Sequence, residues 1–187
     1  MKNTKKLVTT AMLIALATVL SLIPIITMPM GGTVTLLSML PICVISIKYG
    51  VKQGLIGAFL YALIQLALGF SQLMGWGMNA ATWIGCIVFD YIAAFTVLGL
   101  AGIFCTNEKK SGVSIIAGIT LVLILRFISH FISGTIFFAN WAPEDWNAAL
   151  YSIVYNGTYM LPELIFTLIA ACTLFYVPGT KKLVVQN

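Results

Sequence analysis

Four Asp, Glu, Arg or His side chains stand inside otherwise apolar stretches of this 187-residue sequence: Asp90, Arg126, His130 and Glu163. A charge at the centre of a lipid bilayer costs about 2.5–3.5 kcal/mol on insertion scales, so such residues usually pair or line a site. Two arrangements are open. Arg126 and Glu163 can form a structural ion pair that leaves Asp90 as an unpaired carboxylate, which favours a cationic ligand. Alternatively, Arg126 pairs with Asp90 and leaves Glu163 near the inner side.

Depth in the bilayer places several polar side chains at one level. An α-helix rises about 1.5 Å per residue, so three side chains on three helices lie roughly 10–13 Å below the outer helix ends. These three are Asp90, His130 and Asn156. Tyr151 lies above them, and Arg126 and Glu163 lie about 6–10 Å deeper. We therefore expect a polar binding site in the outer half of the membrane.

One helical stripe adds ring contacts to this site. Arg126, His130, Gly134 and Phe138 follow i, i+4 spacing and share one slowly turning face. Gly134 would let a flat ligand approach the backbone between an imidazole and a phenyl ring, and stacking of a cationic ring contributes about 0.5–2 kcal/mol. The alternative interpretation is a helix-packing glycine flanked by core aromatic residues.

The last apolar stretch carries its own polar stripe. Asn156 has a buried amide that needs partners and can read the edge of a heterocyclic ring. Tyr155 and Tyr159 are interpreted as anchors at the membrane interface, where tyrosine is common.

The elements that must position these residues are membrane-spanning helices. The chain is 60% hydrophobic and 8% charged, whereas a soluble domain has about 25% charged residues. Charged residues and turn signals divide the chain into six apolar stretches, at residues 7–28, 33–47, 53–70, 83–105, 113–138 and 147–177. A span needs about 20 apolar residues, so the second stretch, which contains Pro41, is expected to be broken or tilted. We predict an all-α integral membrane protein with six transmembrane helices in one domain, residues 1–187.

The basic residues predict the orientation. Nine of the ten fall in four places: Lys2, Lys5 and Lys6; Lys48 and Lys52; Lys109 and Lys110; Lys181 and Lys182. The other three loops, 29–32, 71–82 and 139–146, contain no Lys or Arg. By the positive-inside rule, both termini are cytoplasmic. The net charge of +5 thus indicates topology, and no nucleic-acid partner is expected.

Catalytic and cofactor motifs are not found in the sequence. There is no G-x-x-x-x-G-K-[ST] loop, so ATP would have to be bound by another chain. The four cysteines are isolated, without metal-ligand or redox spacing, and no metal site is expected. An intramembrane serine hydrolase is a remote alternative, because there is no G-x-S-G motif and Ser133 follows His130 on the same helix. Ala11 and Ala15 have the small-x-x-x-small spacing that lets another helix approach closely, and that helix can belong to this chain or to a partner.

Three stretches point to a known family. The most specific is H-F-I-S-G-T-I-F-F at 130–138, followed by Y-S-I-V-Y-N-G at 151–157. The second is Asp90-Tyr91 followed by A-A-F-T-V-L-G-L-A-G, and the third is A-M-L-I-A followed by L-S-L-I-P near the N-terminus. Over residues 11–167 the chain resembles the thiamine-specific substrate-binding subunit, the S component, of energy-coupling factor (ECF) transporters.

The resemblance implies an S-component fold in a bacterial plasma membrane. Such a subunit captures thiamine from outside and delivers it inward with a separate transmembrane scaffold subunit and two ATPase subunits. The resemblance also implies that Ala11 and Ala15 contact the scaffold. The substrate-binding residues that it implies are Asp90, Tyr91, His130, Gly134, Phe138, Tyr151 and Asn156.

The chain departs from the family pattern at three positions. The family often has Glu where this chain has Asp90, Trp where it has Phe138, and a Trp in the first external loop where it has Gly32. Phe in place of Trp weakens stacking on a cationic ring. Three tryptophans are candidates to replace the loop residue: Trp76, Trp83 and Trp141. An S component for another small heterocycle, such as the pyrimidine half of thiamine, is the alternative function.

Overall fold

Five helices of the computed structural model, which describes residues 2–29, 31–106 and 110–177, are long and apolar enough to cross a membrane. Four are uninterrupted: α1 (Lys2–Ser21), α3 (Val51–Gly75), α6 (Gly112–Phe137) and α7 (Ala148–Tyr176). The fifth is the continuous run Ala80–Leu100. These helices confirm the all-α membrane fold and correspond to five of the six predicted spans.

The run Ala80–Leu100 changes helix type in its middle. It begins as α4 (Ala80–Cys86), continues as the π-helix η1 (Ile87–Ala93), and ends as α5 (Ala94–Thr96) and the 3₁₀-helix η2 (Val97–Leu100). Asp90 lies at the centre of the π-helical segment. π-Helices are rare, and those that occur are often at functional sites. Because Asp90 belongs to the predicted site, the π-helical segment lies at the level of that site.

Polar caps in the sequence define where several helices begin. The Asn147 side chain accepts a hydrogen bond of 2.7 Å from the Leu150 amide at the start of α7. The Ser111 hydroxyl accepts one of 3.1 Å from the Ser114 amide at the start of α6. These bonds satisfy backbone donors that the first helical turn leaves without a partner.

The predicted boundaries of the first two spans are wrong. Helix α1 ends at Ser21, and an antiparallel hairpin follows, made of β1 (Pro24–Thr27) and β2 (Thr33–Thr35). Pro24 cannot continue a helix, and the β-branched residues on both strands favour extended backbone. In the turn, Gly31 has a φ of 86°, which glycine adopts without strain. The second predicted span is therefore β2 followed by the 11-residue helix α2 (Met39–Tyr49).

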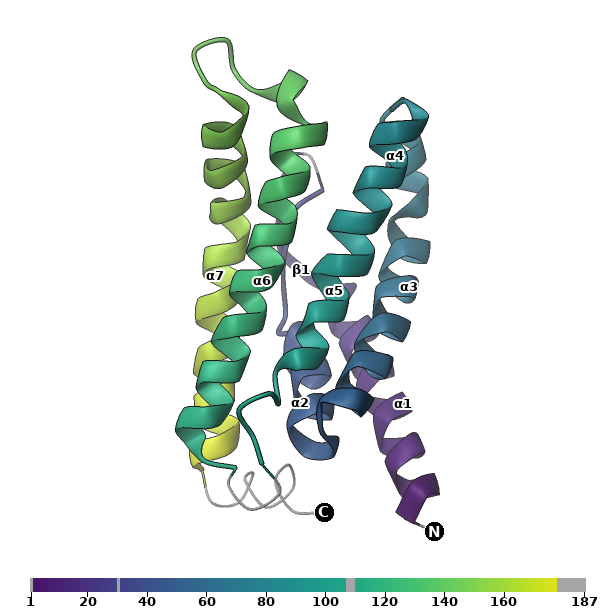
Figure 1. Ribbon diagram of the computed structural model, residues 1–187, viewed down its shortest axis with the longest axis vertical. Coiled ribbons are helices and arrows are strands. Elements are labelled where there is room, and N and C mark those ends of the chain that lie inside the picture. The colour runs from purple at the N-terminus through teal and green to yellow at the C-terminus, as the bar shows by residue number, and fades with distance from the viewer. Residues whose placement is uncertain (1, 30, 107–109, 178–187) are drawn as a thin grey trace.

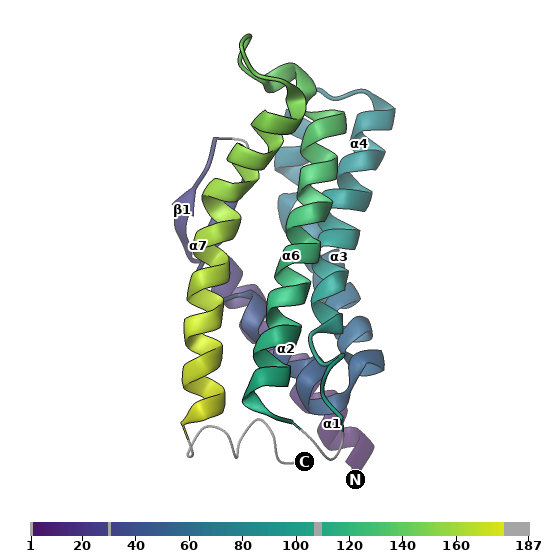
Figure 2. The same cartoon turned by 60° about the vertical axis from the view of Figure 1, so that its left-hand side comes forward.

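The helices form an elongated bundle with α1 beginning and α7 ending at the same end (Figure 1). Helix α6 packs along α7, and α3 packs against α2 and the η1–η2 run. The hairpin lies beside α7 (Figure 2). The loop from Ala139 to Asn147, which includes the short 3₁₀-helix η3 (Ala139–Trp141), lies at the end opposite the start of α1 (Figure 1). Lys109, Lys181 and Lys182 of the predicted topology lie outside the described residues.

The end of the bundle that contains α2 is tightly packed. Met39 to Ile47 are all buried, as expected for a helix that is apolar on every face. The Ser46 hydroxyl donates a 2.5 Å hydrogen bond to the Gly99 carbonyl and accepts one of 2.9 Å from the Gly102 amide. A Cβ added at Gly118 would meet the Ala101 carbonyl oxygen. Backbones therefore touch at this end, because glycine leaves no side chain between them.

We expect Gly118→Ala to lower the free energy of unfolding by about 1–3 kcal/mol, because the new methyl group forces backbone to shift in a packed core. Gly157→Ala, in α7, is the matched control, because a Cβ there meets nothing within 4 Å and alanine favours a helix. Thermal unfolding of the two purified variants in detergent measures the difference. Equal unfolding temperatures would contradict the packing argument.

Candidate ligand-binding site

A cavity of about 280 Å³ lies between α3, η1, α6, α7 and the hairpin. Its volume is near the lower end of the range of small-molecule sites, roughly 300–1,000 Å³. It is lined by all seven residues that the sequence analysis associates with substrate: Asp90, Tyr91, His130, Gly134, Phe138, Tyr151 and Asn156. The structure thus brings these residues together around one space, while their role in binding stays a prediction.

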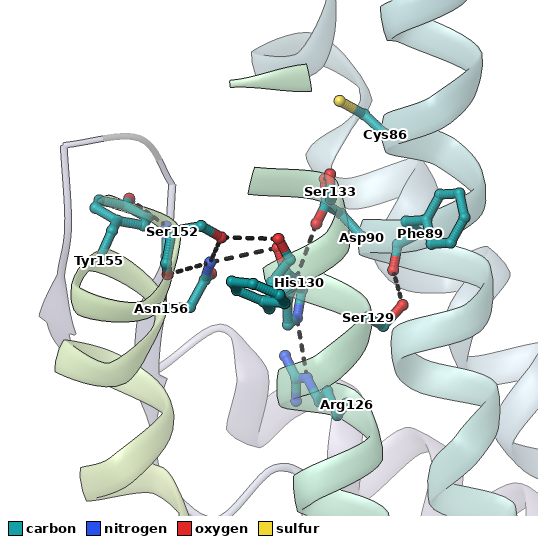
Figure 3. Close-up of polar contacts among 12 residues, drawn as sticks. Cys86, Phe89, Asp90, Arg126, Ser129, His130, Ser133, Ser152, Tyr155 and Asn156 are labelled. Carbon is teal, nitrogen blue, oxygen red and sulfur yellow. Dashed lines mark hydrogen bonds and ion pairs between the residues drawn. The ribbon is translucent and has the colours of Figure 1, made fainter. Parts of the chain in front are cut away.

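A chain of polar contacts runs along one wall of the cavity (Figure 3). The Arg126 Nε donates to His130 Nε2 at 3.3 Å, and His130 Nδ1 lies 2.9 Å from Asp90 Oδ1. Because a guanidinium can only donate, Nε2 must accept, and the imidazole proton is on Nδ1. His130 is therefore neutral in this arrangement and donates to Asp90.

Asp90 is held by two neutral donors. Besides His130, the Ser133 hydroxyl donates a 2.5 Å hydrogen bond to Asp90 Oδ2. The prediction of an unpaired carboxylate is corrected in this respect, because Asp90 has partners on both oxygens. Neither partner is a cation, so the bonds orient the carboxylate without neutralising its charge. The wall of the cavity keeps an anionic group that favours a positively charged ligand.

Neither predicted pairing of Arg126 forms a direct ion pair. Within the described residues the one His, Lys or Arg contact to a carboxylate under 4.0 Å is that of His130 with Asp90. The Arg126 guanidinium lies over the Phe95 ring, 4.3 Å from its centroid, and an Nη atom lies 2.7 Å from the Met39 sulfur. Arg126 is thus stabilised by a ring face, a thioether and a neutral imidazole.

Glu163 is held by the hairpin instead. Its two carboxylate oxygens accept hydrogen bonds from the Thr35 amide and the Thr35 hydroxyl, both at 2.8 Å. The Ser38 hydroxyl lies 2.6 Å from the same Thr35 oxygen, and it must be the donor there because the Thr35 proton is used on Glu163. Glu163 is 1% exposed. The carboxylate therefore connects α7 to β2, and its hydrogen bonds are to Thr35 and not to Arg126.

Asn156 connects α7 to α6. Its amide nitrogen donates to the His130 carbonyl at 3.3 Å and to the Ser152 carbonyl at 2.9 Å, and its oxygen accepts from the Tyr159 hydroxyl at 2.6 Å. A Cβ at Gly134 would meet the Ser152 hydroxyl and lie 3.2 Å from the Asn156 nitrogen. Gly134 thus permits close helix packing, and it also lines the cavity.

Several lining residues were missed in the sequence. Tyr155 and Tyr159, interpreted as interface anchors, both line the cavity. Tyr159 is 5% exposed, and the Tyr155 hydroxyl accepts a 3.3 Å hydrogen bond from the Gly32 amide. The signal was available, because Tyr159 shares a helical stripe with Asn156. Gln65 and Gln72 also line the cavity, and polar side chains inside the apolar α3 would have indicated them.

The aromatic residues near the cavity are not equivalent. Trp76 lines it and meets the Phe138 ring edge to face, with centroids 5.5 Å apart and planes at 85°. Trp83 packs instead on Phe70, at 6.0 Å between centroids, and Trp141 is 51% exposed. Of the three candidate tryptophans, Trp76 alone is among the lining residues.

The geometry does not suit a serine nucleophile. In a catalytic triad the histidine lies between the serine and the acid, so that it can take the serine proton. Here Asp90 lies between His130 and Ser133, and the far nitrogen of His130 faces Arg126. His130 is therefore not positioned to take the proton of Ser133, whose hydroxyl donates to Asp90.

These features define a class of protein. Long apolar helices surround a cavity of ligand size, and that cavity is lined by a carboxylate, amides and aromatic rings. The molecule is a multi-pass membrane protein with a cavity close to small-molecule size inside its helix bundle. The family model described as "Thiamine transporter protein (Thia_YuaJ)" matches residues 7–182, and the chain belongs to this family.

Individual relatives agree with the family match. The chain is 33% identical to "Thiamine transporter ThiT" of Bacillus subtilis, over 93% of this chain and 92% of the relative. It is 27% identical to "Thiamine transporter ThiT" of Lacticaseibacillus paracasei, over 74% of this chain and 71% of the relative. A solved structure of ThiT from Listeria monocytogenes superimposes with a TM-score of 0.74 at 24% identity, covering 96% of this chain and 97% of that one.

The comparisons confirm the resemblance seen in the sequence. Its relatives are bacterial and are named transporters, so the chain is a multi-pass membrane transport protein of bacteria and not an enzyme. The superposition confirms the fold.

The hairpin contact gives a direct test of the site's framework. We expect Thr35→Val to destabilise the protein by about 1.5–3 kcal/mol, the contribution of a hydrogen bond to a charged group, because the shape is kept while Glu163 loses a donor. Thr27→Val is the control, because Thr27 is exposed on the other strand of the same hairpin. Thermal unfolding in detergent compares the two. If Thr35→Val unfolds at the temperature of the control, Glu163 does not depend on this hydroxyl.

Proposed function

We propose that this protein is the thiamine-binding subunit of a vitamin importer. The observation that carries the proposal is the Asp90 carboxylate, which faces the cavity and is oriented by the neutral donors His130 and Ser133. Thiamine joins a positively charged thiazolium ring to an aminopyrimidine, so it needs an anion, hydrogen-bonding groups and aromatic faces. The names of the relatives, thiamine transporters, support the same ligand.

Each lining residue has a role in this proposal. Asp90 provides the charge, and the Asn156 amide oxygen, which accepts one hydrogen bond from Tyr159, has a second lone pair for the edge of a ring. Both ring nitrogens of His130 are bonded within the protein, so His130 orients the Asp90 carboxylate. Phe138, Tyr91 and Tyr151 provide aromatic surface, with stacking worth about 0.5–2 kcal/mol for a cationic ring. Gly134 lines the cavity and allows α7 to pack closely on α6, which brings Asn156 to the site.

The transport cycle requires other chains. We propose that the chain acts as a single binding domain, residues 1–187, in the plasma membrane with both termini cytoplasmic. It captures thiamine from outside and delivers it inward together with an ECF scaffold subunit and two ATPases. The sequence has no phosphate-binding loop for ATP, which supports a separate source of energy.

Asp90→Asn tests the charge of the site. We expect the affinity of the purified protein for thiamine, measured by calorimetry without ATP, to fall about 10- to 100-fold, because a charged hydrogen-bonding group is replaced by a neutral one. The affinity for the neutral pyrimidine half should change much less. Asp145→Asn, in the exposed loop before α7, is the isosteric control and should bind as the unmodified protein does.

The same titrations separate the two candidate ligands. Tighter binding of the pyrimidine half than of thiamine would favour the alternative, an S component for a precursor. Absence of any heat with thiamine at micromolar protein would refute the leading proposal.

Ala11 and Ala15 test the coupling to a scaffold. Both lie on an exposed face of α1, next to Met12 and Leu16, which are 67% and 48% exposed. We expect Ala15→Trp or Ala11→Trp to abolish thiamine uptake by cells and to leave binding by the purified protein unchanged, because the large side chain blocks close helix approach. Ile169→Trp, at an exposed position of α7, is the control and should retain both. Loss of binding together with uptake would indicate a folding defect instead.

A further inference from the structure

Four tryptophans are present, and they differ in their access to the cavity. Trp76 lines it. Trp83 packs against Phe70, and its indole nitrogen is buried without a hydrogen-bond partner in the structure. Trp141 and Trp146 lie in the loop between α6 and α7 and are 51% and 39% exposed. A ligand in the cavity can therefore meet one indole ring.

Trp76 is placed by the end of α3. The helix ends at Gly75, and Trp76 is the capping residue, with φ −80° and ψ −5°. Gly77 then takes a positive φ of 63°, and neither flanking glycine has an atom within 4 Å of a Cβ position. Trp76 therefore follows directly on the end of α3, and it is partly buried and lines the cavity.

Phe138 holds the indole in position from the end of α6. The two rings meet edge to face at 5.5 Å between centroids, and both line the cavity. An edge-to-face contact uses at most one face of one ring, so the pair leaves aromatic faces available to a ligand. Indole is the ring that attracts a cation most strongly, so Trp76 offers a stronger cation–π surface than Phe138.

We infer that Trp76 is a specificity-determining residue of this site, whose indole face contacts the cationic ring of the ligand. The inference rests on the proposed function, because it takes thiamine as the ligand. Asp90 lines the same cavity as Trp76. The positive charge of the ligand is therefore recognised by a carboxylate and an indole together. Trp76 thus favours a cationic heterocycle over a neutral one of similar shape.

Tryptophan fluorescence tests the contact directly. Thiamine is expected to change the fluorescence of the full-length purified protein and of Trp83→Phe to a similar extent, and to have little effect on Trp76→Phe. Trp83→Phe is the matched control, because it removes an indole that does not line the cavity and whose nitrogen has no partner in the structure. Phenylalanine keeps a ring at position 76, so the fold is retained. An undiminished signal in Trp76→Phe would overturn the inference.

Affinities for two ligands test the specificity. Trp76→Ala is expected to weaken thiamine binding about 2- to 30-fold, the range of a cation–π contact expressed as affinity. Binding of the pyrimidine half, measured at mildly alkaline pH so that this ligand is neutral, should be nearly unchanged. Equal weakening for both ligands would show that Trp76 only fills space, which overturns the inference while the proposed function stands. Failure of the unmodified protein to bind thiamine would instead refute the proposed function.

Discussion

The hydrogen-bonded chain from Arg126 through His130 to Asp90 is the interaction on which the site depends. Burying a charge in a helix bundle is costly unless polar groups compensate it. Here the imidazole accepts from the guanidinium on one side and donates to the carboxylate on the other, so a neutral group separates two opposite charges. If Arg126 paired directly with Asp90, the carboxylate would be neutralised. With His130 between them, no Arg or Lys of the described residues lies within 4.0 Å of the Asp90 carboxylate.

Helix α6 carries Arg126 and His130 of this hydrogen-bonded chain, and it is bonded to η1 on one side and to α7 on the other. Toward η1, the Ser129 hydroxyl donates to the Phe89 carbonyl at 2.6 Å, and Ser133 donates to Asp90 (Figure 3). A π-helical turn disturbs the regular backbone ladder, and the Ser129 bond satisfies a carbonyl within it. Toward α7, Gly134 allows the close approach that lets Asn156 reach the His130 carbonyl. Residues of α6 that lie three, four and seven positions apart thus contact two neighbouring elements, η1 and α7.

The sequence was sufficient to predict features that depend on residues close to one another along the chain. Five of the six spans predicted from apolar length are helices long enough to cross a membrane. The rise per residue placed Asp90, His130 and Asn156 at one level, where hydrogen bonds connect them. It was insufficient where the outcome depends on distant partners. The contact of Glu163 with Thr35 joins positions 128 residues apart, and the apolar residues of the two strands directly adjoin the apolar stretches on either side of the hairpin. Helix rotation, which turns Arg126 toward Phe95 and Met39, depends on packing that spacing alone does not encode.

The distribution of charge, more than its total, makes a basic protein suited to a cationic ligand. The lysines near the start of α1 and the end of α2 lie at one end of the bundle, while Glu144 and Asp145 lie in the loop at the other end (Figure 1). With Arg126, Asp90 and Glu163 all charged and His130 neutral, the buried cluster carries one more negative than positive charge. Local fields, and not net charge, determine which ions a cleft attracts. A cation that approaches from the acidic end would meet attraction in the loop and again at Asp90, while the lysines at the start of α1 and the end of α2 lie at the opposite end.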